Sequence, residues 1–417
     1  MSINSYDTEE MNTLNKKIEN KIAWRHREIE GTAEFNQLKV LNAFKKNKIS
    51  DSHFNPTTGY GYDDHGRDAL EAVYADTFKA DAALVRPQII SGTHAINIAL
   101  FGTLRPGDEL HYITGKPYDT LEEIIGIRGT NNGSLKDFGI HYKQTDLLND
   151  DIDIDSVLAN MSDKTKVVGI QRSKGYAVRP SFTINKIKKI IAEIKSIYPN
   201  VIIFVDNCYG EFVESEEPIE AGADLIAGSL IKNPGGGLAK TGGYLAGRQD
   251  LIDLCAFRMT SPGIGAEAGA SLYSLQEMYQ GFFLAPHVVS QALKGAVFTS
   301  ALLEEAGMKT TPSWDEYRTD LIQAVEFHDR AKMIAFCQGV QEFSPINANF
   351  TPHPDYMPGY EDDVIMAAGT FVQGSSIELS ADGPLRPPFA AYIQGGLTYE
   401  HVKIAITGAL KKMNNNL

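Results

Sequence analysis

The strongest hydrophobic periodicity of the chain lies between Ile184 and Tyr198. Isoleucines recur there every three or four residues with lysines on the other positions, which predicts an amphipathic helix that ends at a Pro-Asn pair. The next run, VIIFV at 201–205, is apolar at successive positions, as expected for a central parallel strand that is covered on both faces. This strand places Asp206 at its carboxyl end, where ligands collect in open α/β sheets.

The same alternation of apolar strands and amphipathic helices extends from about residue 66 to 250. A helix is predicted over Arg67–Phe78, and another begins at Ser91. Strands are expected near Leu110, Ile140 and Val168. This order predicts the α/β class, with a sheet that carries helices on both faces.

The two ends of the chain follow other patterns. The first 50 residues are polar and typical of helices, and a long helical stretch is expected over 268–306. After it we expect a strand at 321–327, an amphipathic helix around Met333 to Val340, a strand pair within 364–380 and a closing helix at 399–412. The predicted organisation is an N-terminal helical arm (1–60), a large α/β domain (61–290) and a smaller α+β domain (291–417).

Composition narrows the class of protein. The 417 residues, of which 43% are hydrophobic and 22% charged, suit a globular protein of two domains. With 39 basic and 53 acidic residues, the net charge of -14 argues against a nucleic-acid partner. Three scattered cysteines and the lack of a metal-ligand cluster predict a reducing compartment and no metal site. Since no apolar run is long enough to span a bilayer, we expect a cytoplasmic protein without a membrane anchor.

Three features, in chain order, have the chemistry that pyridoxal 5'-phosphate (PLP) requires. The run Ser91-Gly92-Thr93-His94-Ala95 opens a helix, whose N-terminal N–H groups attract a phosphate dianion. Asp206 offers a carboxylate to hold a proton on the pyridine nitrogen. Lys232, in GSLIKNPGGG, offers the amine for a Schiff base, and we expect burial to lower its pKa. Together they predict a PLP site.

Four runs, FNPTTGYGYDDHGRDALE, SGTHAINIALFG, VDNCYGEFVE and GSLIKNPGGGLAKTGGYLAG, resemble the aluminium-resistance or methionine gamma-lyase-like family. This family is a branch of the fold-type I PLP-dependent enzymes, the aspartate aminotransferase-like fold, near the cystathionine lyases. The similarity covers nearly the whole chain. It implies a Schiff base at Lys232, a pyridinium partner at Asp206, and phosphate contacts from Gly92, Thr93 and Ser229.

The resemblance also implies further contacts with the cofactor. Tyr118 corresponds to a tyrosine that stacks on the cofactor ring. In related lyases a tyrosine and an arginine reach the phosphate of the neighbouring subunit, and Tyr60 or Tyr62 with Arg67 would match them here, although the usual spacing is lacking. A homodimer or homotetramer with shared active sites is therefore implied.

A substrate carboxylate calls for a guanidinium, which binds it in a bidentate way. Arg386 is the first candidate, and Arg172 and Arg179 are the alternatives. The implied activity is a PLP-dependent carbon–sulfur lyase acting on a small-molecule amino acid of the cystathionine, methionine or cysteine type, by β- or γ-elimination. The alternatives are another PLP reaction, by an aminotransferase or aldolase, or a non-catalytic PLP-binding regulatory protein.

Several of these residues also have a purely structural interpretation. Lys240 and Lys174 are the alternatives to Lys232 as the reactive lysine. Asp206 also suits a turn or a helix cap at the end of a strand. Tyr118 has equal standing as an ordinary buried aromatic residue. The sequence leaves these alternatives open.

Overall fold

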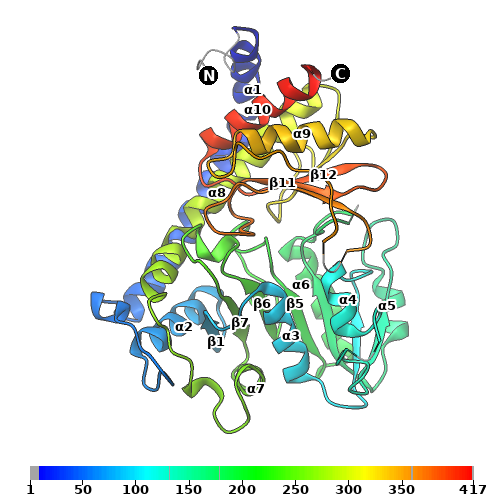
Figure 1. Cartoon of the computed structure of the whole chain (residues 1–417). Coiled ribbons are helices and arrows are strands. Elements are labelled where there is room, and N and C mark those ends of the chain that lie inside the picture. The colour runs from blue at the N-terminus through cyan, green and yellow to red at the C-terminus, as the bar shows by residue number, and fades with distance from the viewer. Residues whose placement is uncertain (1–8, 131, 178, 358–359, 416–417) are drawn as a thin grey trace.

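We describe residues 9–130, 132–177, 179–357 and 360–415 of a computed structural model, which contains two sheets, one above the other (Figure 1). The larger sheet has seven strands: β1 (Ala82–Arg86), β2 (Glu109–Tyr112), β3 (His141–Gln144), β4 (Thr165–Gln171), β5 (Ile202–Asp206), β6 (Leu225–Ser229) and β7 (Gly243–Gly247). Their order in the sheet is β1-β7-β6-β5-β4-β2-β3. Neighbours are parallel except at β7, which is antiparallel to both β1 and β6.

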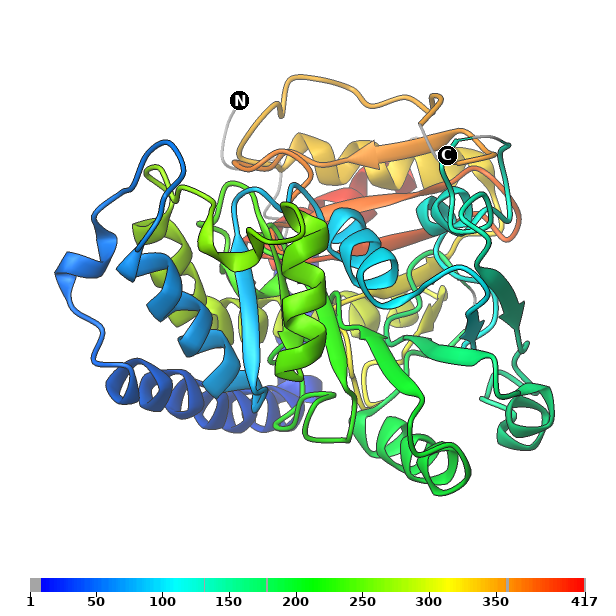
Figure 2. The same ribbon diagram turned by 90° about the horizontal axis from the view of Figure 1, so that it is seen from below.

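Helices cover both faces of the large sheet (Figure 2). They are α2 (His65–Phe78), α3 (Gly92–Thr103), α4 (Asp119–Ile125), α5 (Ile154–Asn160), α6 (Ile184–Ile197) and α7 (Gln249–Met259). In β5, Ile203 and Val205 pack into the core that contains α2 and α6, whereas Ile202 and Phe204 pack into the core that contains α3 and α7. The strand is therefore apolar at every position because alternate side chains enter two different cores.

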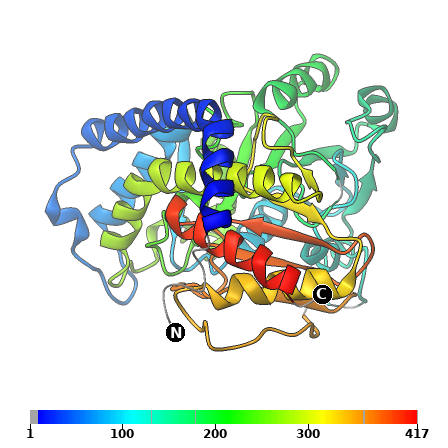
Figure 3. The same cartoon turned by 90° about the horizontal axis from the view of Figure 1, so that it is seen from above.

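The smaller sheet is antiparallel and has the order β10-β11-β12-β9-β8. Its strands are β8 (Lys309–Thr311), β9 (Gln323–Glu326), β10 (Val364–Ala367), β11 (Ser380–Pro384) and β12 (Ala390–Gln394). The helices α9 (Arg330–Glu342) and α10 (Tyr399–Asn415) lie together on the face that points away from the large sheet (Figures 1 and 3). The other face looks toward the carboxyl ends of the large-sheet strands (Figure 1).

Two long helices, α1 (Glu9–Lys46) and α8 (Leu275–Glu305), run together from the small sheet to the large one (Figure 1). The early part of α1 packs in the small core through Ile18 and Ile22, and its later part packs in the large core through Val40 and Ala43. The predicted boundary at 290–291 falls inside α8, close to where that helix passes from one core to the other. Short 3₁₀ helices are η2 (Asp51–Phe54), η3 (Asn233–Gly235) and η4 (Gly265–Glu267).

The predicted fold class is confirmed: a large mixed α/β sheet is followed by a smaller α+β part. The described residues begin with the long helix α1, and α6 and β5 match their predicted ranges to within a residue or two. The strands β1, β7, β8 and β12 were not predicted. Among the described residues, no helix has the length and apolar character needed to cross a membrane.

Candidate active site

A cavity of about 350 Å³ lies where the carboxyl ends of the large-sheet strands face the small sheet. Its walls come from the start of α3, the ends of β5 and β6, and the small-sheet strands β10, β11 and β12. Six residues that the sequence assigned to the cofactor line it together: Gly92, Thr93, Tyr118, Asp206, Ser229 and Lys232. Segments more than a hundred residues apart therefore meet at one site.

The start of α3 has the features of a phosphate cradle. Ser91 caps this helix, and its hydroxyl accepts a hydrogen bond from the His94 N–H at 3.0 Å. A Cβ on Gly92 would lie 3.2 Å from Cys208 Sγ and 3.3 Å from Ser229 Cβ, so glycine lets the helix approach β6 closely. First-turn N–H groups have no acceptor within their own helix, and Ser229 Oγ is buried without a partner among the described residues. These donors fit a phosphate dianion.

Asp206 is a buried carboxylate at the end of β5. Its Oδ1 accepts a hydrogen bond from the Cys208 N–H at 3.1 Å. Burial raises the pKa of Asp206, and the positive charge of Lys232 opposes that rise. A proton-bearing ring nitrogen would give this carboxylate the charge-assisted partner that suits it.

Lys232 follows β6 and precedes η3, with its Nζ 3.9 Å from the centre of the Tyr209 ring. Burial by itself would lower the pKa of Lys232, but Cys208, Tyr209 and Asp206 around it outweigh that effect and raise the pKa. The expectation of a lowered pKa is therefore wrong for the protein alone, because the sequence does not show how many acidic groups converge on this amine. Bringing a cationic ring next to it would reduce that bias.

The rival lysines lie elsewhere. Lys240 is exposed and forms an ion pair with Glu277 at 2.5 Å. Lys174 is buried in a second cavity and donates to the Thr311 carbonyl at 2.7 Å. Among the described residues that line the first cavity, Lys232 is the only lysine.

Tyrosines form one wall of the cavity. Tyr118 precedes α4, its N–H donates to Gln171 Oε1 at 2.8 Å, and its hydroxyl shares a hydrogen bond with that of Tyr360. Burial raises the pKa of Tyr118 far above its usual range, so this phenol stays neutral. Tyr176, with its ring centre 6.5 Å from that of Tyr118, continues the wall. Sequence reasoning missed Tyr176, Tyr209 and Tyr360, because nothing local distinguishes them from core aromatics.

A second buried carboxylate, Asp382, enters the cavity from β11. It accepts hydrogen bonds from the Tyr176 hydroxyl and, at 3.1 Å, from Gln394 Nε2. Burial raises the pKa of Asp382 to about 6, while its hydrogen bonds oppose the rise. This residue is therefore mostly anionic at neutral pH. The sequence reasoning passed over it, since Ala-Asp-Gly-Pro is typical of a turn.

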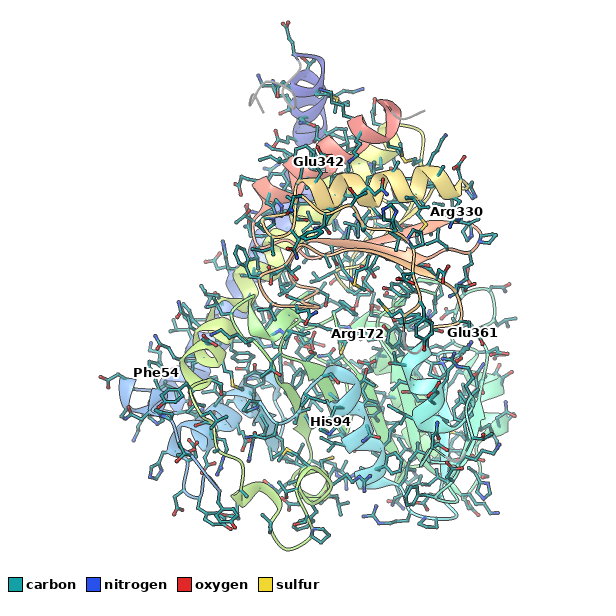
Figure 4. The ribbon with its side chains drawn as sticks, viewed as in Figure 1. Phe54, His94, Arg172, Arg330, Glu342 and Glu361 are labelled. Carbon is teal, nitrogen blue, oxygen red and sulfur yellow. The ribbon has the colours of Figure 1, made fainter. Side chains whose placement is uncertain are left out.

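The structure does not bring Arg386 or Arg172 into this cavity. Arg386 is partly exposed, and its Nη1 lies 3.0 Å from Asp362 Oδ2. Arg172 lies beneath the small sheet (Figure 4), fully buried, and donates to Asn207 Oδ1 at 2.8 Å and Glu214 Oε1 at 3.0 Å. Since Arg172 is held by buried acceptors of its own chain, its role in this arrangement is to tie the segments beneath the cavity together.

The other predicted contacts also lie outside the cavity. Arg179 lines the second cavity, where it donates to the carbonyls of Gln171 and Ser173. The exposed rings of Tyr60 and Tyr62 stack with their centres 5.4 Å apart. Arg67 beside them is buried and donates to the Gly61 carbonyl at 2.6 Å. Tyr60 and Tyr62, on the loop before α2, and Arg67, in the first turn of α2, thus lie near one another but do not line the Lys232 cavity.

The fold is that of the fold-type I PLP-dependent enzymes. The PLP-dependent protein YhfS from Escherichia coli shares it, with a TM-score of 0.61 at 18% identity over 92% of this chain and 97% of that one. The family model described as methionine gamma-lyase matches residues 11–414, and the chain belongs to this family. The resemblance drawn from the sequence is confirmed, and the protein is an enzyme of a lyase family.

Close relatives span almost the full chain. The "Uncharacterized protein YnbB" of Bacillus subtilis is 68% identical over 399 residues, 95% of each chain. A structure from Listeria monocytogenes, named "putative cystathionine beta-lyase involved in aluminum resistance", is 65% identical with a TM-score of 0.95 and covers 96% of this chain and 100% of its own. A "carbon-sulfur lyase involved in aluminum resistance" from Clostridium novyi NT is 49% identical with a TM-score of 0.93, over 97% and 96% of the two chains.

Proposed function

We propose that this enzyme is a PLP-dependent carbon–sulfur lyase that cleaves a cystathionine-type amino acid. The observation that carries the proposal is the pairing of one lysine, Lys232, with one buried carboxylate, Asp206, in a cavity that a helix N-terminus also reaches. The names of the close relatives support carbon–sulfur cleavage. PLP, when bound, supplies the electron sink that stabilises negative charge at the substrate α-carbon.

Six residues of the cavity are assigned to holding the cofactor. The N–H groups of Gly92 and Thr93 and the Ser229 hydroxyl bind the phosphate. Asp206 keeps the proton on the ring nitrogen, because a buried carboxylate without a basic hydrogen-bond partner favours a cationic neighbour. Tyr118 packs on one face of the ring, and Lys232 is the point of covalent attachment.

Lys232 is also the base of the reaction. With PLP and substrate bound, the Lys232 Nζ would accept the proton from the substrate α-carbon. The bond from sulfur to the β- or γ-carbon then breaks, and the sulfur leaves as a thiol after taking up a proton. Water completes the reaction by releasing a keto acid and ammonia. Tyr118 lines the same cavity, and its neutral phenol helps to orient the leaving group.

The acidic wall favours one kind of substrate. Asp382 is anionic at neutral pH and lies in a wall that also holds Gln394 and Ser380. Such a wall attracts a distal ammonium group, which cystathionine has and methionine lacks. We therefore place the amino group of the leaving arm beside Asp382.

A second copy of the chain is proposed to complete the site. No arginine is among the described residues that line the cavity, although a substrate carboxylate calls for one. Tyr60 and Tyr62 are exposed on a loop away from the cavity of their own chain. A homodimer or homotetramer would allow this loop to approach a neighbouring site.

Product analysis tests the function. The purified enzyme with PLP is incubated with cystathionine, methionine or cysteine, and keto acid, thiol and ammonia are measured. We expect cystathionine to be turned over fastest; pyruvate with homocysteine indicates β-elimination, and 2-oxobutyrate with cysteine indicates γ-elimination. Lys232→Ala should abolish turnover, while Lys240→Ala, a change at an exposed lysine, should not. A requirement for a keto-acid acceptor would show an aminotransferase instead.

A further inference from the structure

The space between the two sheets contains a second cavity of about 460 Å³. Its walls come from residues 174, 177 and 179–181, which follow β4, and from β8, β9 and β12 of the small sheet. Apolar groups such as Pro180, Pro312 and Ala390 line part of it. The charged residues that line it are Asp150, Lys174, Arg179, Lys309, Glu316, Arg318, Asp320 and Glu326.

The buried charges of this cavity do not balance. Lys174, Arg179 and Arg318 are at most 8% exposed, and none of them forms an ion pair with the described residues. The one buried carboxylate is Asp320, whose oxygens accept from the hydroxyls of Ser173 and Ser181 and from a backbone N–H. Three cations thus face one acid that neutral donors already occupy.

The acids at the rim do not restore the balance. The carboxylate of Glu326 is already held by Lys309 in an ion pair at 2.7 Å, so it has a cationic partner other than the three buried ones. Glu316 and Asp150 are exposed to solvent. Water screens exposed charges strongly, so they compensate a buried cation only weakly.

Arg318 shows the imbalance at atomic detail. Its Nη2 donates to Gln323 Oε1 at 2.5 Å, but Nε and Nη1 are buried without a hydrogen-bond partner among the described residues. Unpartnered buried guanidinium nitrogens are rare, because a charged donor that loses water normally gains an acceptor. Burial lowers the pKa of Lys174 to about 8 and that of Arg179 and of Arg318 to about 10, in keeping with cations that lack an anion.

We propose that this second cavity binds a small oxyanion-bearing molecule, a phosphate compound or a dicarboxylate, through Lys174, Arg179 and Arg318. The excess of two buried positive charges matches a dianion. Guanidinium groups recognise the oxygens of both classes, and the apolar part of the wall leaves room for a carbon skeleton. The site is separate from the Lys232 cavity and does not depend on the proposed reaction.

The two cavities share a wall through which binding can be sensed. Lys174, Ala177 and Arg179 line the second cavity, whereas Tyr176 of the same segment lines the first. The Tyr392 hydroxyl, from the second cavity, donates to the Tyr176 carbonyl at 2.8 Å. An anion that orders this segment would therefore fix the tyrosine that donates to Asp382.

Calorimetric titration of the PLP-loaded enzyme tests the proposal. The probes are inorganic phosphate and succinate, in an amine buffer whose protonated form has chloride as its counterion and which contains no other oxyanion. We expect at least one to bind with a dissociation constant of about 1 mM or below, and to bind at least about tenfold more weakly to Arg318→Gln and to Lys174→Met. The surface change Arg248→Gln should keep the affinity of the unmodified enzyme.

Each outcome bears on the proposal. Binding of phosphate alone identifies a phosphorylated ligand, and binding of succinate alone identifies a dicarboxylate. Two variants are used because a folded Lys174→Met protein keeps the test valid if Arg318→Gln does not fold. Absence of binding by both probes, or equal affinity in the folded cavity variants and the unmodified enzyme, overturns the proposal.

Discussion

The two cavities between the sheets hold buried charge in opposite ways. In the first, the lysine Lys232 is surrounded by acidic groups that include Asp206, and a second buried carboxylate, Asp382, lines the same cavity. In the second, Lys174, Arg179 and Arg318 exceed the single buried acid Asp320. The first cavity is therefore arranged for ligands that bring positive charge near its acids, and the second for a ligand that brings negative charge.

The two cavities therefore suit different ligands, the first a cofactor and the second an anion. A cofactor with a cationic ring nitrogen and an anionic phosphate needs a carboxylate at one end and N–H donors at the other, and the first cavity has both. An anion needs only fixed cations, which the second cavity has. Buried charges cost free energy unless they are compensated, so each imbalance indicates what the missing partner is.

The largest effect is expected when the negative charge of Asp206 is removed from the first cavity. Asp206→Asn should lower kcat by about 10²–10³-fold, because the amide no longer stabilises the charge on the ring nitrogen. Cofactor absorption should persist, since Lys232 and the phosphate donors are unchanged. Steady-state kinetics with saturating PLP measure the effect, and Asp250→Asn, at a surface ion pair with Arg248, is the matched control. Unchanged kcat in Asp206→Asn would contradict the assignment.

A smaller effect is expected when the negative charge of Asp382, the second buried carboxylate of the first cavity, is removed. Asp382→Asn should lower kcat/KM for cystathionine by about 10–100-fold, the value of one charge-assisted contact, and should change that for methionine much less. In the unmodified enzyme, kcat/KM for cystathionine should be undiminished near pH 8. It should fall in the same way as the pH drops through about 6, where Asp382 gains its proton. Equal losses for both substrates would assign Asp382 a structural role.

Sequence patterns predicted the parts of this arrangement that repeat locally. The strand β5, the helix α6 and the three cofactor segments follow from hydrophobic spacing and from the N-terminal signal of α3. Asp382 and the tyrosine wall could not be found in this way, because a contact between Tyr176 and β11 spans about two hundred residues of chain. Arg386 shows the converse: its residue type suited a carboxylate clamp, but Asp362 occupies it.

The excess of buried positive charge in the second cavity can be tested through the pH dependence of the free energy of unfolding. The folded pKa of Lys174, about 8, lies below the unfolded value, so the unfolded chain binds more protons between pH 8 and 10. The free-energy cost of burying Lys174 is therefore full below pH 8 and fades as pH rises toward 10. Lys174→Met should be more stable than the unmodified enzyme by about 1–2 kcal/mol at pH 7 in a buffer poor in oxyanions, and this advantage should shrink by pH 10. Chemical denaturation at several pH values measures it, and an advantage that grows with pH would refute the charge imbalance.

The smallest effect is expected at Arg386. Because its ion pair with Asp362 is partly exposed, Arg386→Ala should change the free energy of unfolding by less than about 1 kcal/mol. The KM for cystathionine should change less than about threefold if Arg386 stays on Asp362. A rise in KM of tenfold or more, with kcat retained, would restore Arg386 as the carboxylate clamp and show that the small sheet closes over the cavity.

The attachment of the cofactor is the central claim and can be measured directly. The enzyme is incubated with PLP, treated with borohydride to make the linkage permanent, digested, and analysed by mass spectrometry. The account predicts that the pyridoxyl mass is found on the peptide that contains Lys232. Label on Lys174 or Lys240 instead, or no specific label on any lysine, would contradict it.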